Sequence, residues 1–210
     1  MFHDLPLFIL AGIVLNFTPG PDMVFFGSRA ASQGFKSGLA AFMGVCAGCL
    51  VHTLAAALGL SAILTTSAEA FLVVKVIGAA YLIWVGIGML RERSAGALTL
   101  DGALSVAPHR IAFMQGFWTN TLNPKVALFF LAFLPQFIHA GTPDRALAFF
   151  ILGFIFILNS MVTMIPLIWF FARMGERVRG SAAITTWLNR ACGALFVGVG
   201  IKLALTERPA

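Results

Sequence analysis

The 210-residue sequence contains little charge: 10% of its residues are Asp, Glu, Lys or Arg, whereas 60% are hydrophobic. A soluble domain carries about 25% charged residues, so most of this chain has no water to face. The apolar residues come in runs of about 20, the length at which a helix crosses about 30 Å of hydrocarbon. The composition therefore predicts an all-α integral membrane protein in contact with the lipid bilayer.

Several functional motifs are also missing from the sequence. No Ser-His-Asp arrangement, phosphate-binding loop or nucleotide motif is visible, so neither an enzyme nor a cofactor is expected. No cluster of His, Cys, Asp or Glu has the spacing of metal ligands, so no metal is expected. The net charge of +6 does not indicate nucleic-acid binding, because the basic residues lie between the apolar runs rather than on one face.

Charged and turn-rich breaks divide the chain into six predicted spans within one transmembrane domain, residues 1–210. We expect the first apolar run to be retained as a span, because no basic leader precedes it. The loops after the first, third and fifth spans hold eight Lys and Arg residues, against two in the other loops and tails. This asymmetry predicts cytoplasmic odd-numbered loops and two periplasmic termini. The predicted spans cover roughly residues 5–27, 39–63, 72–90, 111–138, 146–171 and 187–205.

The two halves of the chain share a pattern that predicts an internal repeat. The third and sixth spans agree in their small residues, whereas the second does not align convincingly with the fifth. Alternatively, Gly and Ala recur only because they let membrane helices pack. Three spans is an odd number, so a repeat gives two inverted halves, about residues 1–100 and 101–210, as in secondary transporters. At an offset of 104 residues, the first span has Gly12-x3-Asn16-x8-Phe25-Phe26 where the fourth has Gly116-x3-Asn120-x8-Phe129-Phe130.

A proline-containing segment interrupts the first and fourth spans. Proline removes backbone donors and Gly20 relaxes the backbone, so both helices are predicted to break near the membrane midplane. We expect Thr18, before Pro19, and Asn123, before Pro124, to be the N-caps of the restarted half-helices. The backbone groups that the breaks leave unpaired need hydrogen-bond partners, and a bound polar solute is the simplest partner. The two segments read Asn16-Phe17-Thr18-Pro19-Gly20-Pro21-Asp22 and Asn120-Thr121-Leu122-Asn123-Pro124-Lys125.

The two breaks carry opposite charges. Asp22 is suited to capping a helix N-terminus, whereas Lys125 opposes the dipole of its half-helix and costs on the order of 3 kcal/mol at the centre of a span. A structural Asp22–Lys125 pair is one interpretation, and substrate binding is the other. In the binding interpretation, Lys125 and the half-helix N-termini receive a carboxylate. An ammonium group is then received by Asp22, freed carbonyls and Asn16 or Asn120, and Asp22 couples transport to protons.

Five further polar or reactive residues lie inside predicted spans. For His52, midway along the second span, a packing role and a proton role are both open. Cys46 and Cys49 have C-x-x-C spacing among small residues, which favours buried packing. A membrane-embedded thiol-redox carrier using these cysteines is the alternative function. In the fifth span, Asn159 and Ser160 either pack or line a path.

Motifs in both halves together are fairly specific: Thr18-Pro19-Gly20-Pro21, and Gly116-Phe117-x3-Thr121-Leu122-Asn123-Pro124-Lys125 before Phe133-Leu134-Pro135-Gln136-Phe137. With the Gly-rich second span, they resemble the lysine-exporter and homoserine/threonine-exporter family of bacterial amino-acid translocators. The resemblance implies an inner-membrane exporter of amino acids or their derivatives, driven by proton antiport, and leaves a homodimer open. It also implies a central site at residues 18–22 and 123–125. The single intramembrane acidic group favours a neutral substrate over a dibasic one.

Overall fold

The computed structural model describes residues 1–18, 20–60, 108–139 and 141–174, and isolated residues between 73 and 87 and between 190 and 201. The predicted third and sixth spans lie almost wholly outside the described residues. The described part is helical, apart from an isolated bridge between Phe2 and Ile138. Its helices are α1 (Leu5–Phe17), α2 (Pro21–Gln33), α3 (Phe35–Ala55), α6 (His109–Thr121), α7 (Pro124–Ala132) and α8 (Arg145–Met174), with a π-helical turn η1 (Ala56–Leu60) and a 3-10 turn η2 (Leu134–Phe137).

The described helices include membrane-spanning candidates at predicted positions. Phe35–Gly59 and Arg145–Arg173 are long and apolar enough to cross a bilayer. The pair α1 and α2 is a third candidate when it counts as one span, bent by 59° at its break. These segments coincide with the predicted second, fifth and first spans. Six spans and an inverted repeat remain predictions.

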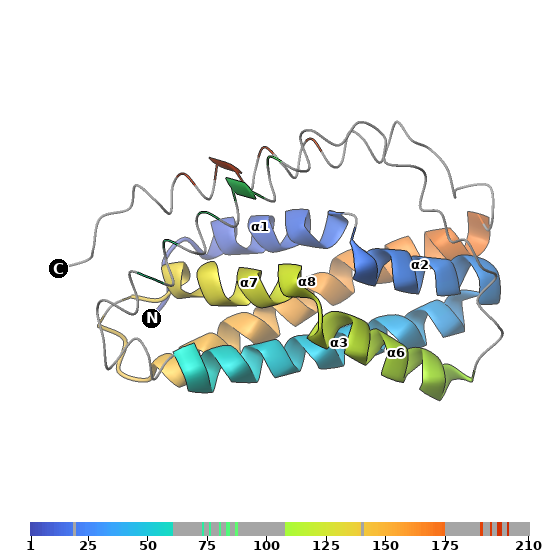
Figure 1. Ribbon diagram of the computed structural model, residues 1–210, viewed down its shortest axis with the longest axis horizontal. Coiled ribbons are helices and arrows are strands. Elements are labelled where there is room, and N and C mark those ends of the chain that lie inside the picture. Colours follow the sequence, from blue (N-terminus) through green and yellow to red (C-terminus); the bar gives the residue numbers. More distant parts are fainter. Residues whose placement is uncertain are drawn as a thin grey trace.

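Figure 1 shows the described helices packed side by side along the long axis of the molecule. The α1–α2 pair runs from left to right and the α6–α7 pair from right to left, so the two broken helices are antiparallel. Helices α3 and α8 also run in opposite directions. Both breaks lie near the middle of the bundle, which brings residues about a hundred positions apart in sequence into contact.

Helix α2 extends farther than hydropathy predicts: it ends at Gln33 rather than at residue 27. The apolar run stops at residue 27, but the helix continues, and its next three residues, 28–30, are buried inside the protein. Arg29 is 2% exposed, and its guanidinium donates to Gln115 Oε1 of α6 at 2.6 Å. Arg29 is therefore a buried helical residue, whereas the charge count placed it in a loop. Without it the count is seven against two (eight minus one), which leaves the predicted orientation unchanged.

A single glycine separates α2 from α3. Gly34 has φ of 84°, a conformation that favours glycine, and its N–H donates to the Ala30 carbonyl at 2.9 Å. Helix α3 therefore begins at Phe35 rather than at the predicted residue 39. The connection is thus a single residue, whereas hydropathy predicted a break from residue 28 to residue 38, because the helix ends on both sides of Gly34 contain polar residues.

Glycines bring α3 and α6 into backbone contact. A Cβ added at Gly44 would collide with the carbonyl oxygen of Phe113, and one added at Gly116 would collide with the carbonyl oxygen of Ala41. Small residues allow such close packing where lipid offers no hydrophobic driving force between helices. This contact fixes the second break, at the end of α6, against α3.

Phenylalanine rings fill the core between α1, α7 and α8. The Phe129 and Phe133 rings stack with centroids 4.8 Å apart, and Phe133 lies 4.8 Å from Phe137. Phe8 of α1 meets the Phe137 ring edge-on at 5.2 Å. These rings are almost fully buried, so one end of the bundle is closed by apolar packing.

Candidate substrate site at the two helix breaks

The first break lies between α1 and α2. Thr18 ends α1: its N–H donates to the carbonyls of Val14 and Leu15 at 3.0 and 3.2 Å. Its hydroxyl also donates to the Val14 carbonyl, at 2.7 Å. Gly20 then takes an extended conformation as the N-cap of α2, and Pro21 occupies the first helical position.

The prediction that Thr18 caps the second half-helix is therefore wrong. The hydroxyl of Thr18 bonds back to its own helix, an alternative always open to Ser and Thr side chains. The sequence offers two prolines, and Pro21 rather than Pro19 begins α2. Pro19 itself lies outside the described residues. Because proline has no N–H, the Leu15 carbonyl takes the N–H of Thr18 instead.

The second break confirms the predicted cap. Asn123 is the N-cap of α7, and its Oδ1 accepts from the N–H of Lys125 at 3.0 Å. Pro124 occupies the first position of α7. Proline cannot donate to the carbonyl one turn earlier, that of Asn120. This carbonyl accepts instead from the N–H of Asn123 at 2.9 Å.

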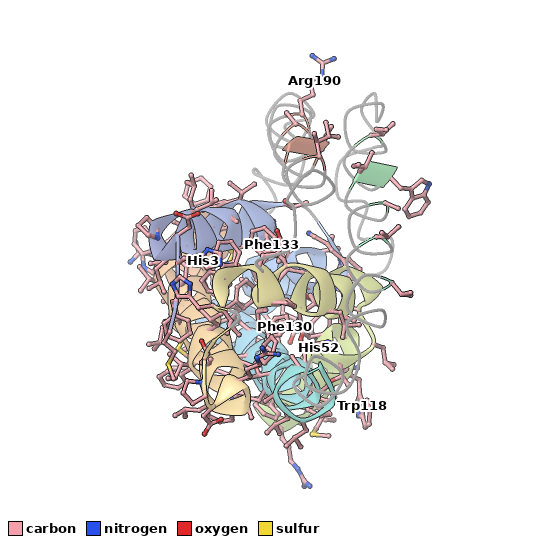
Figure 2. The ribbon with its side chains drawn as sticks, turned by 90° about the vertical axis from the view of Figure 1, so that its left-hand side faces the viewer. His3, His52, Trp118, Phe130, Phe133 and Arg190 are labelled. Carbon is pink, nitrogen blue, oxygen red and sulfur yellow. The ribbon has the colours of Figure 1, made fainter. Side chains whose placement is uncertain are left out.

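His52 also binds the carbonyl of Asn120, through Nε2 at 3.0 Å. A bond to a carbonyl oxygen requires a proton on Nε2, so the imidazole is the donor. The His52 ring lies beside Phe130 of α7, with centroids 5.9 Å apart (Figure 2). The sequence left a packing role and a proton role open for His52. In this geometry the ring packs beside Phe130 and gives a backbone carbonyl at the second break a hydrogen-bond partner.

Side chains of the second break bind the charged residue of the first. Asp22, in the first turn of α2, accepts at Oδ2 from the amides of Asn120 at 2.8 Å and Asn123 at 3.1 Å. In return, the ammonium of Lys125 donates to the Thr18 carbonyl at 3.1 Å. Lys125 and Asp22 are close enough to attract each other electrostatically. Each break is thus held by a group from the other.

A cavity of about 50 Å³ lies beside the breaks, with room for a few water molecules. Its polar lining comes from α1, α2, α7 and α8 and includes five of the eleven predicted site residues, whereas His52 and Asn120 do not line the cavity. Ser160, for which the sequence left packing or a path open, is on this wall. The polar lining residues are Asn16, Thr18, Asp22, Asn123, Lys125 and Ser160.

Two acceptor atoms at the site have no hydrogen-bond partner among the described residues. They are Oδ1 of Asp22 and Oδ1 of Asn120, both buried. Leaving a buried acceptor unsatisfied costs about 1–3 kcal/mol, and more for a charged group. Because Asp22 lines the cavity, its Oδ1 is an acceptor suited to a cationic ligand. No group of His, Cys, Asp or Glu in the described part of the chain could hold a metal ion.

The LysE type translocator family matches residues 13–207 of the chain. The chain belongs to this family. The translocator is 31% identical over 197 residues to a homoserine/homoserine lactone efflux protein of Salmonella typhimurium, with 94% of each chain covered. It is 30% identical over 209 residues to a threonine efflux protein of Escherichia coli, covering 93% of this chain and 94% of the relative. No solved structure matches the translocator.

These matches confirm the family resemblance and make the chain a membrane transporter rather than an enzyme. The alternative function, a thiol-redox carrier, finds no support. Cys46 and Cys49 are free thiols, 5% and 4% exposed, on the cavity side of α3. They are packing residues of the translocator, small enough for α3 to lie close to the site.

Proposed function

We propose that this translocator exports small neutral amino acids or their derivatives from the cytoplasm across the bacterial inner membrane. The observation that carries the proposal is that Asp22 and Lys125, which can carry opposite charges, line one cavity beside the two helix breaks. An amino acid carries an ammonium and a carboxylate group a few atoms apart, and the cavity offers one partner for each. The names of the relatives, which are efflux proteins for homoserine, its lactone and threonine, support this substrate class.

In the proposed complex, Asp22 binds the substrate ammonium and Lys125 binds the carboxylate. Asp22 has a spare acceptor, Oδ1, beside the oxygen that the two asparagine amides already hold. Lys125 exchanges the Thr18 carbonyl, a neutral acceptor, for a charged one, which forms a stronger hydrogen bond. The N-terminus of α7 adds a partial positive charge beside the same carboxylate.

The cavity favours a neutral side chain. Asp22 is the one carboxylate among the described residues that line it, and the ammonium group of the substrate uses that charge. A dibasic amino acid would bring a second cation with no carboxylate to receive it. A buried unpaired charge is costly, so the site selects against such substrates.

Helix contacts support the proposal of two inverted halves that move against each other around the site. A Cβ at Gly12 of α1 would meet Asn159 Nδ2 of α8 at 2.7 Å. Its counterpart in the sequence repeat, Gly116 of α6, lies against the backbone of α3, where an added Cβ would meet the Ala41 carbonyl oxygen. Each glycine thus lets a broken helix approach a helix of the other proposed half. An inverted repeat predicts such corresponding positions in its two halves.

We propose that Asp22 also couples export to the proton gradient. Substrate and proton then compete for one carboxylate, so a proton entering from the periplasm releases the ammonium group there. The two amides on Oδ2 keep the side chain in place in both states. Competition of this kind exchanges one proton for one zwitterionic substrate.

The test is amino-acid release from preloaded cells that express wild type, Lys125→Ala, or empty vector, with and without an uncoupler. We expect wild-type cells to release an amino acid faster than vector cells, and the uncoupler to abolish the difference. Lys125→Ala should lose at least about tenfold, because hydrogen bonds to charged groups contribute about 1.5–3 kcal/mol. Lys36→Ala, which removes an exposed lysine of α3, is the matched control and should retain export. Equal release by wild-type and vector cells would refute the proposal.

A further inference from the structure

We infer that Asn16 of α1 and Ser160 of α8 form a subsite for a hydroxyl group on the side chain of the transported amino acid. The inference rests on the proposed function, because it assigns a binding partner to one part of an exported amino acid. It narrows the substrate class to short amino acids that carry a side-chain hydroxyl.

Both residues lie on the wall of the cavity that Asp22 and Lys125 also line. Asn16 is in the last turn of α1, just before Thr18, whose carbonyl binds Lys125. Ser160 approaches from α8, and its hydroxyl donates to Asn16 Oδ1 at 3.0 Å. A substrate held by its charged groups at Asp22 and Lys125 would therefore have this polar pair within the same cavity.

The pair has hydrogen-bonding capacity to offer a ligand. The single proton of the Ser160 hydroxyl is shared between Asn16 Oδ1 and the carbonyl of Phe156, at 3.0 and 2.8 Å. When Ser160 keeps the bond within its own helix, Asn16 Oδ1 becomes available as an acceptor. Asn16 Nδ2 carries two N–H groups, and its bond to Thr163 Oγ1 is long, at 3.4 Å. A ligand hydroxyl can thus accept from Asn16 Nδ2 and donate to the hydroxyl oxygen of Ser160, which has two acceptor lone pairs.

The cavity wall around this pair is apolar. Leu15, Phe156, Ile157 and Met164 line it on the α1 and α8 side. A ligand hydroxyl placed against these side chains would lose its water without gaining a partner, which is unfavourable. Asn16 and Ser160 are therefore where a side-chain hydroxyl would bind.

Packing between α1 and α8 has other sources. Gly12 allows the two helices to approach, and the amide of Asn159 donates to the Ile9 carbonyl at 3.1 Å. These contacts lie nearer the start of α1 and away from the cavity lining. The Asn16–Ser160 pair is a further polar contact between α1 and α8, and both of its residues line the cavity.

The test compares two amino acids of the same shape, L-threonine and L-valine, in which a methyl group replaces the hydroxyl. Purified full-length protein is reconstituted into liposomes loaded with either radiolabelled compound, and initial efflux rates are measured. We expect wild type to prefer threonine, and Ser160→Ala to lower the threonine-to-valine ratio about fivefold, the effect of one neutral hydrogen bond of about 1 kcal/mol. Valine efflux should be unchanged or faster.

Ser28→Ala is the matched control. Ser28 is also a buried serine whose hydroxyl donates to a carbonyl of its own helix, that of Val24, but it does not line the cavity. This variant should keep the wild-type ratio. Wild-type efflux that is equal for threonine and valine would overturn the subsite, whatever the variants do, while export itself would stand. An unchanged ratio in Ser160→Ala would also overturn it. If wild type moved no amino acid at all, the proposed function would fail, and the subsite with it.

Discussion

Asn120 connects the two helix breaks through both its backbone and its side chain. Its carbonyl, which Pro124 cannot satisfy, binds His52 of α3, and its amide binds Asp22 of α2. The residue is 1% exposed. A buried amide in this position orients the Asp22 carboxyl group, which both the binding and the coupling proposals require.

Asp22→Asn tests whether export needs the charge of Asp22 or only its hydrogen bonds to Asn120 and Asn123. The substituted amide keeps an oxygen that can accept from Asn120 and Asn123, so we expect near wild-type expression and melting temperature in detergent. Export should fall at least about tenfold, because the ammonium group loses a charge-assisted bond of about 1.5–3 kcal/mol. The residual export should no longer respond to an uncoupler.

The measurement is efflux from preloaded cells with and without the proton gradient. Asp144→Asn provides the control, because Asp144 is an exposed carboxylate that binds the N–H of Leu147 at the start of α8. That variant should export normally. Gradient-driven export that survives in Asp22→Asn would remove Asp22 from the coupling mechanism.

At the scale of elements, the α3–α6 contact holds the second break in place. Gly44 and Gly116 allow each backbone to touch the other, and His52, farther along α3, then reaches the Asn120 carbonyl. Sequence predicted glycine-mediated packing in general, since small residues recur in these spans. It did not predict which helices meet, because two spans of similar composition offer no signal for partner choice.

Gly116→Ala should destabilise the translocator, because the added methyl group would collide with the backbone carbonyl of Ala41. Overpacking of this kind costs about 1–3 kcal/mol. We expect a lower melting temperature in detergent, measured by the loss of the monodisperse peak after heating. In contrast, the methyl group of Gly59→Ala meets no atom among the described residues, so this variant should melt like wild type. Equal melting of the two variants would contradict the proposed importance of this contact.

At the scale of the whole molecule, the two broken helices, α1–α2 and α6–α7, run in opposite directions (Figure 1). If α1–α2 and α6–α7 are corresponding parts of an inverted repeat, each half has an odd number of spans. The total is then even, and both termini lie on the same side of the membrane. The distribution of Lys and Arg predicts that this side is the periplasm.

Reporter fusions test this orientation. We expect alkaline phosphatase fused to the C-terminus to be active and green fluorescent protein at the same position to be dark, because the first reporter folds only outside the cytoplasm. A fusion of either reporter within residues 91–110, the loop after the third predicted span, should give the opposite result and serves as the control. A fluorescent C-terminal fusion would reverse the predicted orientation.

The sequence alone determined the membrane setting, the family, the two breaks and the Asn123 cap. These features depend on local chemistry: long apolar runs, proline without an N–H, and an amide next to a helix start. The sequence led to the wrong N-cap for α2, Thr18 instead of Gly20, because two prolines offered two possible helix starts. It placed Arg29 in a loop, because hydropathy does not distinguish the end of a helix from a buried polar turn.

Only the tertiary structure decided which groups meet at the site. The amides of Asn120 and Asn123 bind Asp22, and Lys125 binds the Thr18 carbonyl, across about a hundred residues of sequence. Ser160 and Asn16 are also far apart in the sequence, and the fold brings them together on the cavity wall. Contacts between distant segments depend on how helices pack and in which direction they run, and no local pattern in the chain specifies either.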